Sequence, residues 1–165
     1  MQPIEINTYS SVYKNDVADL VLNIQQQEFN IPITLEDQPD LQKIEHFFQS
    51  GNGNFWVATI DNNVIGTIAL ADIGNQQVAL RKMFVKEGFR GAAFGAGQAL
   101  LNTVFEWSKE KHLTDIFLGT TEKYLAAHRF YEKNGFTEIK KTELPKAFPV
   151  MQVDNKFYHY PVIVN

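Results

Sequence analysis

Three β-type segments between residues 54 and 85 constrain the fold of this chain more than any other feature. The runs "NFWVATI" and "VIGTIALAD" are rich in β-branched and aromatic residues, and the turn-forming triplet Asp61-Asn62-Asn63 joins them. A second turn, "DIGN" at 72–75, precedes the alternating run "QQVALRKMFV". Because both connections are short, we expect each segment to pair antiparallel with the next.

The segments before and after this meander alternate between helical and strand patterns. They predict a strand over 4–9, a helix over 14–27 capped by Ser10 or Ser11, a short helix at 41–48, a helix over 95–111, a strand over 115–120, a helix ending at Asn134-Gly135, and strands at 136–141 and 156–164. Since the strand 115–120 follows a strand and a helix, we expect it to run parallel to 76–85 through a right-handed crossover. The expected fold class is α/β, a mixed sheet with an antiparallel N-terminal half and parallel central strands.

The composition indicates one domain over residues 1–165 that acts on small molecules. A chain of 165 residues with 44% hydrophobic residues is long enough for one sizeable core. It has no cysteine, which excludes a disulfide framework, a thiolate metal site and a cysteine nucleophile. A net charge of -4 argues against nucleic acid as a partner. No leader pattern or long apolar run is present, so we expect no membrane association and a cytoplasmic location.

The stretch "FRGAAFGAGQALL" at 89–101 lies between the last strand of the meander and a helix. The first-turn N–H groups of a helix have no backbone partners, and small residues let an anion approach them. Amides between Gly91 and Gly97 are therefore candidates to bind a diphosphate, with Arg90 guiding or clamping it. Tight packing of the helix against the strand explains the small residues equally well. Neither a Walker loop nor a clean G-x-G-x-x-G is present.

At this point the sequence resembles the GNAT superfamily of N-acetyltransferases. The resemblance covers roughly residues 54–139 and rests on the order of "LRKMFV", "FRGAAFGAGQALL", "IFLGT" and "AAHRFYEKNGF". The family's phosphate signature, Gln/Arg-x-x-Gly-x-Gly/Ala, matches Arg90, Ala93 and Gly95, with alanine for the first glycine. A second register places the two glycines at Gly95 and Gly97.

A second family signature lies on the helix that follows the strand 115–120. A small residue followed by x-x-aromatic-Tyr-x-x-x-Gly-Phe matches this sequence at Ala127, Phe130, Tyr131, Gly135 and Phe136. Three residues before the alanine the family commonly has an asparagine, and this chain has Tyr124. The polar contact to the cofactor that the family's asparagine would make is therefore not expected in the same form from Tyr124.

The resemblance implies a GNAT-like acyl-CoA N-acyltransferase fold, with acetyl-CoA as the donor and coenzyme A as the product. It implies that the pantetheine lies along the backbone of Met83, Phe84 and Val85. It also implies that Tyr131 is the general acid that protonates the departing sulfur. The remaining cofactor-binding residues that it implies are those of the pyrophosphate loop and of the second signature: Arg90, Gly91, Ala92, Ala93, Gly95, Ala96, Gly97, Ala127 and Phe130.

The reaction expected from these residues is direct attack of a primary amine in a ternary complex. No cysteine and no Ser/His/Asp order that fits a triad is present to carry a covalent acyl-enzyme. The general base stays open between Glu28, Asp72 and the carboxylates of "LEDQPD". None of the four histidines has metal-ligand spacing, so we expect no metal.

The amine acceptor is expected to be a small molecule or a peptide. Between Lys14 and Lys43 the chain carries six acidic residues and no Lys or Arg, which indicates either an acidic wall facing a cationic amine or an ordinary solvated face. Four residues are candidates for an apolar acceptor pocket or for core packing: Phe29, Trp56, Phe148 and Met151.

Two alternatives remain open at this stage. One is a non-catalytic acyl-CoA-binding sensor, for which Ala93 and Tyr124 are the only indication. The other concerns assembly, because the last strand, "KFYHYPVIV", is apolar. If that strand lies at a sheet edge it offers a homodimer interface, whereas Pro161 would blunt such an edge.

Overall fold

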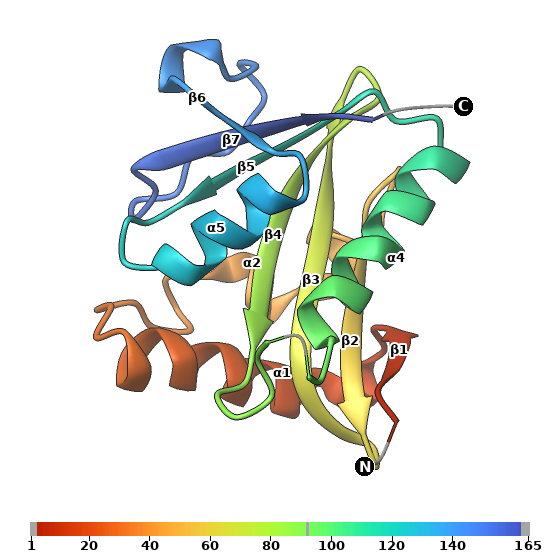
Figure 1. The fold of residues 1–165 in the computed structure, drawn as a ribbon, viewed down its shortest axis with the longest axis vertical. Coiled ribbons are helices and arrows are strands. Elements are labelled where there is room, and N and C mark those ends of the chain that lie inside the picture. The colour runs from red at the N-terminus through yellow and green to blue at the C-terminus, as the bar shows by residue number, and fades with distance from the viewer. Residues whose placement is uncertain (1–2, 92, 163–165) are drawn as a thin grey trace.

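The computed structural model describes residues 3–91 and 93–162, which build one seven-stranded sheet with helices on both faces (Figure 1). Its strand order is β1-β2-β3-β4-β5-β7-β6. The strands are β1 (Glu5–Thr8), β2 (Asn54–Ile60), β3 (Asn63–Gly74), β4 (Gln77–Val85), β5 (Asp115–Thr120), β6 (Thr137–Ile139) and β7 (Lys156–Pro161). Neighbours are antiparallel except β4 and β5, which are parallel. The predicted mixed α/β sheet is confirmed.

The central meander forms as its turn residues predict. Asp61 and Asn62 have φ values of 50° and 66°, the left-handed backbone of a two-residue hairpin turn between β2 and β3. The second turn comes later than expected, since β3 continues to Gly74. Asn75 and Gln76 make this turn, again with positive φ values of 54° and 60°.

The helical segments are α1 (Lys14–Leu22), α2 (Pro39–Gln42), α3 (Ile44–Phe47), α4 (Ala96–Glu110) and α5 (Leu125–Lys133), with short turns η1 (Ser11–Tyr13) and η3 (Lys141–Glu143). The helix expected over 14–27 continues past α1 as a π-helical segment, η2 (Asn23–Glu28). Ser10 is the N-cap of η1, which leads directly into α1, but its side chain makes no cap bond, and Tyr13 is the N-cap of α1 itself. The helix expected at 41–48 is divided into α2 and α3 at Lys43, whose φ of -130° is not helical.

Both faces of the sheet are covered, which explains the continuous burial of β2. In Figure 1, α4 and α5 lie on the near face and α1 and α2 on the other. Side chains alternate along a strand. Phe55 therefore packs in the core of the α1 face, whereas Trp56 packs with Leu100 of α4 in the core of the other face. No helix of the described residues is long and apolar enough to cross a membrane.

The last strand is not at an edge, so the condition under which it would offer a dimer interface is not met. β7 pairs with β5 on one side and with β6 on the other, and β6 is the edge strand. Long connections allow the chain to place its final strand inside the sheet, which the order of elements in the sequence does not indicate. The positions 163–164 of the expected strand lie outside the described residues.

Candidate active site

A cavity of about 1020 Å³ opens where β4 and β5 separate. The two strands pair only from Gln77 with Asp115 to Leu80 with Leu118. Beyond Leu80, β4 carries an extra residue relative to β3, because Thr67 pairs with Phe84 but Ala69 pairs with Arg81. Lys82 lies in this bulge with a φ of 54°. A bulge bends a strand and increases its twist, and here the two strands diverge at the bulge.

The cavity has two sides. One side, called the loop side below, is formed by segments around the 90–95 loop, and the other by segments that are distant from that loop in sequence. The loop side consists of the end of β4, the 90–95 loop, the first turns of α4 and the start of α5. The opposite side is formed by η2, the residue that follows it and the loop before β7, through Ile24, Gln25, Phe29, Met151 and Asp154. The two parallel strands thus part at a cavity, next to the Met83–Val85 segment that the resemblance assigns to the pantetheine.

The N-terminus of α4 presents backbone donors to the loop side. Gly95 caps the helix with a φ of 67°, a conformation that suits glycine, and its own N–H donates to the carbonyl of Gly91 at 3.1 Å. The first helical hydrogen bond runs from Ala99 N–H to Gly95 C=O at 2.9 Å, so the N–H groups of residues 96–98 have no helical partner. Gly97 and Gln98 line the cavity. This arrangement suits an anion.

Arg90 lines the cavity but is held by another residue in this structure. Its Nη1 and Nη2 form a two-pronged ion pair with the carboxylate of Glu28 in η2, with Nη2 at 2.6 Å from Oε1. Its Nε donates to the Val85 carbonyl at 2.7 Å. Glu28, a candidate general base, does not line the cavity, and its negative charge is balanced by Arg90 in this ion pair.

Tyr131 faces the cavity from α5 and is buried. Burial raises the pKa of its phenol, with a smaller contribution from Tyr124, so the hydroxyl carries its proton at neutral pH. Ala127, one turn earlier on the helix, also lines the cavity. Tyr124 takes the position of the family asparagine and packs edge-on against Phe29, with ring centroids 4.8 Å apart.

The structure brings most of the expected cofactor residues together. Those that line the cavity are Met83, Phe84, Val85, Arg90, Gly91, Gly95, Gly97, Ala127 and Phe130. Ala93 is exposed in the loop and Ala96 is fully buried, and neither lines the cavity. Ala92 lies outside the described residues. Of the four apolar candidates for the acceptor pocket, Phe29 and Met151 line the cavity, whereas Trp56 and Phe148 pack in separate cores.

The expected acidic wall does not line the cavity. None of its six carboxylates lines the cavity, and neither does Asp72, the general-base candidate at the far end of β3, whose carboxylate accepts hydrogen bonds from the N–H groups of Asn52 and Gly74, both at 2.8 Å. Glu36 and Asp37 are exposed. The sequence shows the charge of the segment but not which way each carboxylate points.

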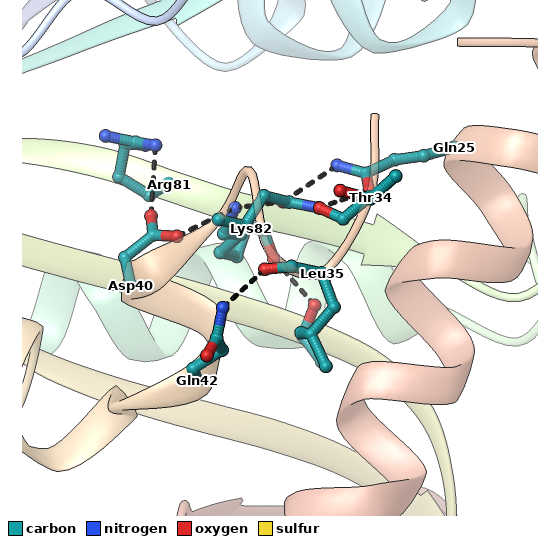
Figure 2. Close-up of polar contacts among 9 residues, drawn as sticks. Gln25, Thr34, Leu35, Asp40, Gln42, Arg81 and Lys82 are labelled. Atoms are coloured by element: carbon teal, nitrogen blue, oxygen red, sulfur yellow. Dashed lines mark hydrogen bonds and ion pairs between the residues drawn. The ribbon is translucent and has the colours of Figure 1, made fainter. Parts of the chain in front are cut away.

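A buried ionic cluster on the acceptor side was not expected (Figure 2). In it, Asp40 of α2 lies between two adjacent cations of β4, with Oδ2 at 3.1 Å from Arg81 Nη2 and Oδ1 at 3.4 Å from Lys82 Nζ. Lys82 Nζ also donates to Gln38 Oε1 at 2.6 Å. Burial lowers the pKa of Lys82 from 10.5 to about 8, although Asp40 favours its charged form. The signal in the sequence was the pair of cations inside the apolar run "VALRKMFV".

Asp154, in the loop before β7, is a second residue that the sequence did not single out. Its carboxylate lies against β5, where a Cβ added to Gly119 would be 2.6 Å from Asp154 Oδ2. Oδ2 accepts the N–H of Met151 at 2.9 Å. Burial raises the pKa of this carboxyl, while its backbone hydrogen bond and the charges of Arg81 and Lys82 act in the opposite direction. Asp154 lines the cavity.

The histidines have roles in packing or at the surface. His128 Nε2 lies 2.9 Å from the Thr121 carbonyl, and His159 Nε2 lies 2.6 Å from Asp115 Oδ1. Among the described residues there is no group of three or more His, Asp or Glu side chains that could hold a metal ion.

The family model and the solved structure that match most of this chain are those of acetyltransferases. The model of the acetyltransferase (GNAT) family matches residues 18–136. A GNAT-family acetyltransferase from Staphylococcus aureus Mu50 has a crystal structure similar over 97% of this chain and 99% of its own, with 42% identity and a TM-score of 0.93.

Two further relatives are informative. N-acetylaspartate synthetase from Xenopus tropicalis is 36% identical over 108 residues, which are 63% of this chain and 38% of that protein. The chain thus spans about two fifths of the length of this curated relative. The PaiA N-acetyltransferase from Thermoplasma acidophilum, solved with coenzyme A, shares the fold with a TM-score of 0.74 and 17% identity, over 96% of this chain and 98% of that one.

The family model covers more than half of the chain, and the Staphylococcus aureus structure agrees with it over almost the whole length. This chain therefore belongs to the GNAT family of acetyltransferases, whose cofactor is acetyl-CoA.

Proposed function

We propose that this protein is an N-acetyltransferase that transfers the acetyl group of acetyl-CoA to a primary amine. The observation that carries the proposal is the cavity between the separating strands β4 and β5, which has the α4 N-terminus on one side and the protonated phenol of Tyr131 in its wall. Family membership supports acetyl transfer, whereas no observation on the described residues favours a non-catalytic sensor. We further propose that the chain works as one domain, in the cytoplasm.

The residues present fit acetyl-CoA, which supplies an activated acetyl thioester when bound. The diphosphate would lie at the N–H groups of residues 96–98 and at Gly91 and Gly95, where small residues leave the backbone accessible. Beyond the bulge, β4 has no strand partner on its β5 side, so the backbone of Met83–Val85 is suited to pair with an extended pantetheine arm. Arg90 would contribute only after exchanging Glu28 for a phosphate.

Tyr131 is the proposed general acid. A phenol whose pKa is raised by burial keeps its proton at neutral pH and donates a hydrogen bond to the sulfur that leaves. The small side chain of Ala127 on the same helical face leaves room beside it. The amine attacks directly, so kinetics should be sequential and no acyl-protein should accumulate.

The acceptor is an amine on a small molecule or a peptide. One relative is named for the N-acetylation of aspartate, which makes free amino acids the first compounds to test. The negative net charge of the chain argues against nucleic acid as a partner.

The test combines calorimetry with coenzyme A and a thiol-release assay with acetyl-CoA against a panel of amines. We expect Tyr131→Phe to lower kcat by about a hundredfold or more, the usual contribution of a general acid, with the Kd for coenzyme A unchanged. Tyr160→Phe is the matched control, because it removes a phenol that packs on Phe105 outside the cavity.

Three results would contradict the proposal. An unchanged kcat in Tyr131→Phe would remove Tyr131 from the acid role, and a trapped acyl-protein would exclude direct attack. A protein that binds coenzyme A but releases no thiol with any amine would be the sensor instead.

A further inference from the structure

The acceptor side of the cavity is basic, and its charges are fixed in position. Arg81 and Lys82 both line the cavity on β4, immediately before the Met83–Val85 segment proposed to hold the pantetheine. Their side chains are 12% and 6% exposed, respectively. A bound acceptor amine near the thioester must therefore lie close to these two cations.

The two cations share a single carboxylate behind them. Asp40 is buried and does not line the cavity, and it pairs with Arg81 through Oδ2 and with Lys82 through Oδ1 (Figure 2). Asp40 alone therefore balances only one of the two positive charges. Buried charges without a partner are costly, so this site favours an anionic group on its ligand.

A network of glutamines orients Lys82. Gln38 is fully buried, and its Nε2 donates to Gln25 Oε1 at 2.9 Å and to the Thr34 carbonyl at 3.2 Å. Its Oε1 therefore faces Lys82 Nζ, at 2.6 Å. An ammonium has three donors, of which Gln38 Oε1 accepts one, whereas Asp40 Oδ1 lies 3.4 Å away as an ion pair without a hydrogen bond. Lys82 Nζ therefore keeps donors for a ligand.

A single carboxylate lines the cavity opposite the two cations, among the residues the structure describes. Asp154, in the loop before β7 with its carboxylate against β5, is close enough to Arg81 and Lys82 to affect its pKa, but it forms no ion pair with either within 4 Å. Both signs of charge therefore line the cavity without pairing directly across it. A ligand that carries both signs on neighbouring atoms fits between them.

We infer that the acceptor is a free amino acid, whose carboxylate binds Arg81 and Lys82 while its ammonium group lies against Asp154. The inference rests on the proposed acetyltransferase function and names its substrate class. Asp154 is then the carboxylate that takes the proton from the ammonium, leaving the neutral amine that attacks. A polycationic acceptor is disfavoured, because it would place like charges beside Arg81 and Lys82.

The test uses the twenty amino acids and their carboxamides as paired acceptors in the thiol-release assay. Each pair has the same amine, and only the acid has the carboxylate. We expect kcat/KM for the best amino acid to exceed that for its carboxamide by about ten- to a hundredfold, the range of a charge-assisted hydrogen bond. Equal rates for the pair, or faster turnover of the carboxamide, would overturn the inference while leaving the acetyltransferase function intact.

Lys82→Met should abolish this preference for the acid. We expect KM for the amino acid to rise about ten- to a hundredfold, with kcat and the KM for acetyl-CoA little changed and the carboxamide unaffected. Lys43→Met, which removes an exposed lysine beside α2, is the matched control and should keep the preference. An intact preference in Lys82→Met would overturn the assignment of the carboxylate site.

Asp154→Asn is a second variant on a different segment, in case Lys82→Met does not fold. It should lower turnover of the acid and the carboxamide alike, because both present an ammonium group. If coenzyme A binds but no amino acid is acetylated, the inference fails. If coenzyme A does not bind at all, the proposed function itself fails.

Discussion

The buried Lys82 ammonium should make the stability of this protein depend on pH in a way that one substitution removes. Burial lowers the pKa of Lys82 from 10.5 to about 8, with Asp40, Arg81 and Asp154 as the charged groups around it. Between pH 8 and 10.5 the unfolded chain keeps a proton on this amine that the folded chain has lost. Stability contributed by this group therefore rises with pH across that window and is constant below it.

The magnitude follows from the pKa difference. A fall from 10.5 to about 8 corresponds to about 3 kcal/mol of differential stabilisation. Lys82→Met keeps the length of the side chain and removes the titration. Asp40 retains its ion pair with Arg81, and carboxylates do not titrate in this range. We expect the free energy of unfolding of the wild type, minus that of Lys82→Met, to increase by about 3 kcal/mol from pH 7 to 10.5.

The assay is urea unfolding of both proteins at pH 7, 8, 9 and 10.5, with equal m-values required for the comparison. Taking the difference between the two proteins cancels the titration of their shared tyrosines and lysines. Lys43→Met controls for the loss of one charge. For each variant, the free energy of unfolding is subtracted from that of the wild type and followed against pH. If this difference rises no more steeply for Lys82→Met than for Lys43→Met, the burial argument is refuted.

Two further substitutions test the core and the acceptor side. Leu100→Ala should lower the free energy of unfolding by about 2–5 kcal/mol in a denaturant titration, because Leu100 is fully buried between α4 and the sheet; a loss below about 1 kcal/mol would contradict this packing. Gly119→Ala should raise KM for the amino acid about tenfold at constant affinity for coenzyme A, since the new Cβ would lie 2.6 Å from Asp154 Oδ2 and force that carboxylate to move. An unchanged KM would show that Asp154 does not contact the acceptor.

Most of the fold could be predicted because its signals are local. The positive-φ turn at Asp61-Asn62, the helical face of α4 and the glycine end of α5 each depend on a few adjacent residues. The parallel β4–β5 pair followed from the strand–helix–strand order of the sequence. The insertion of β7 between β5 and β6 was missed, because no local pattern states which strand a final segment joins.

The cofactor side of the candidate site was predicted much better than the acceptor side. The 90–97 loop is one continuous stretch, so its approach to Met83 through Gly97 follows from a single strand–loop–helix unit. The acceptor side draws on segments that are distant in sequence: Asp40 meets Arg81 across 41 residues, and Glu28 meets Arg90 across 62. Residue pairs so far apart in the sequence produce no periodic pattern from which they could be predicted.

The sequence by itself determined the order of the elements, the turns, the position of the 90–97 loop before α4 and the placement of Tyr131 on its helix, because short-range sterics and periodicity specify them. Only the tertiary structure decided which charges face the acceptor. The segment from Lys14 to Lys43 is acidic in composition, yet its Asp40 turns inward to pair with Arg81 and Lys82 and the exposed carboxylates point away. The sequence shows only the net charge of a segment. The charge of a site depends on which side chains the packing of the fold directs into the cavity.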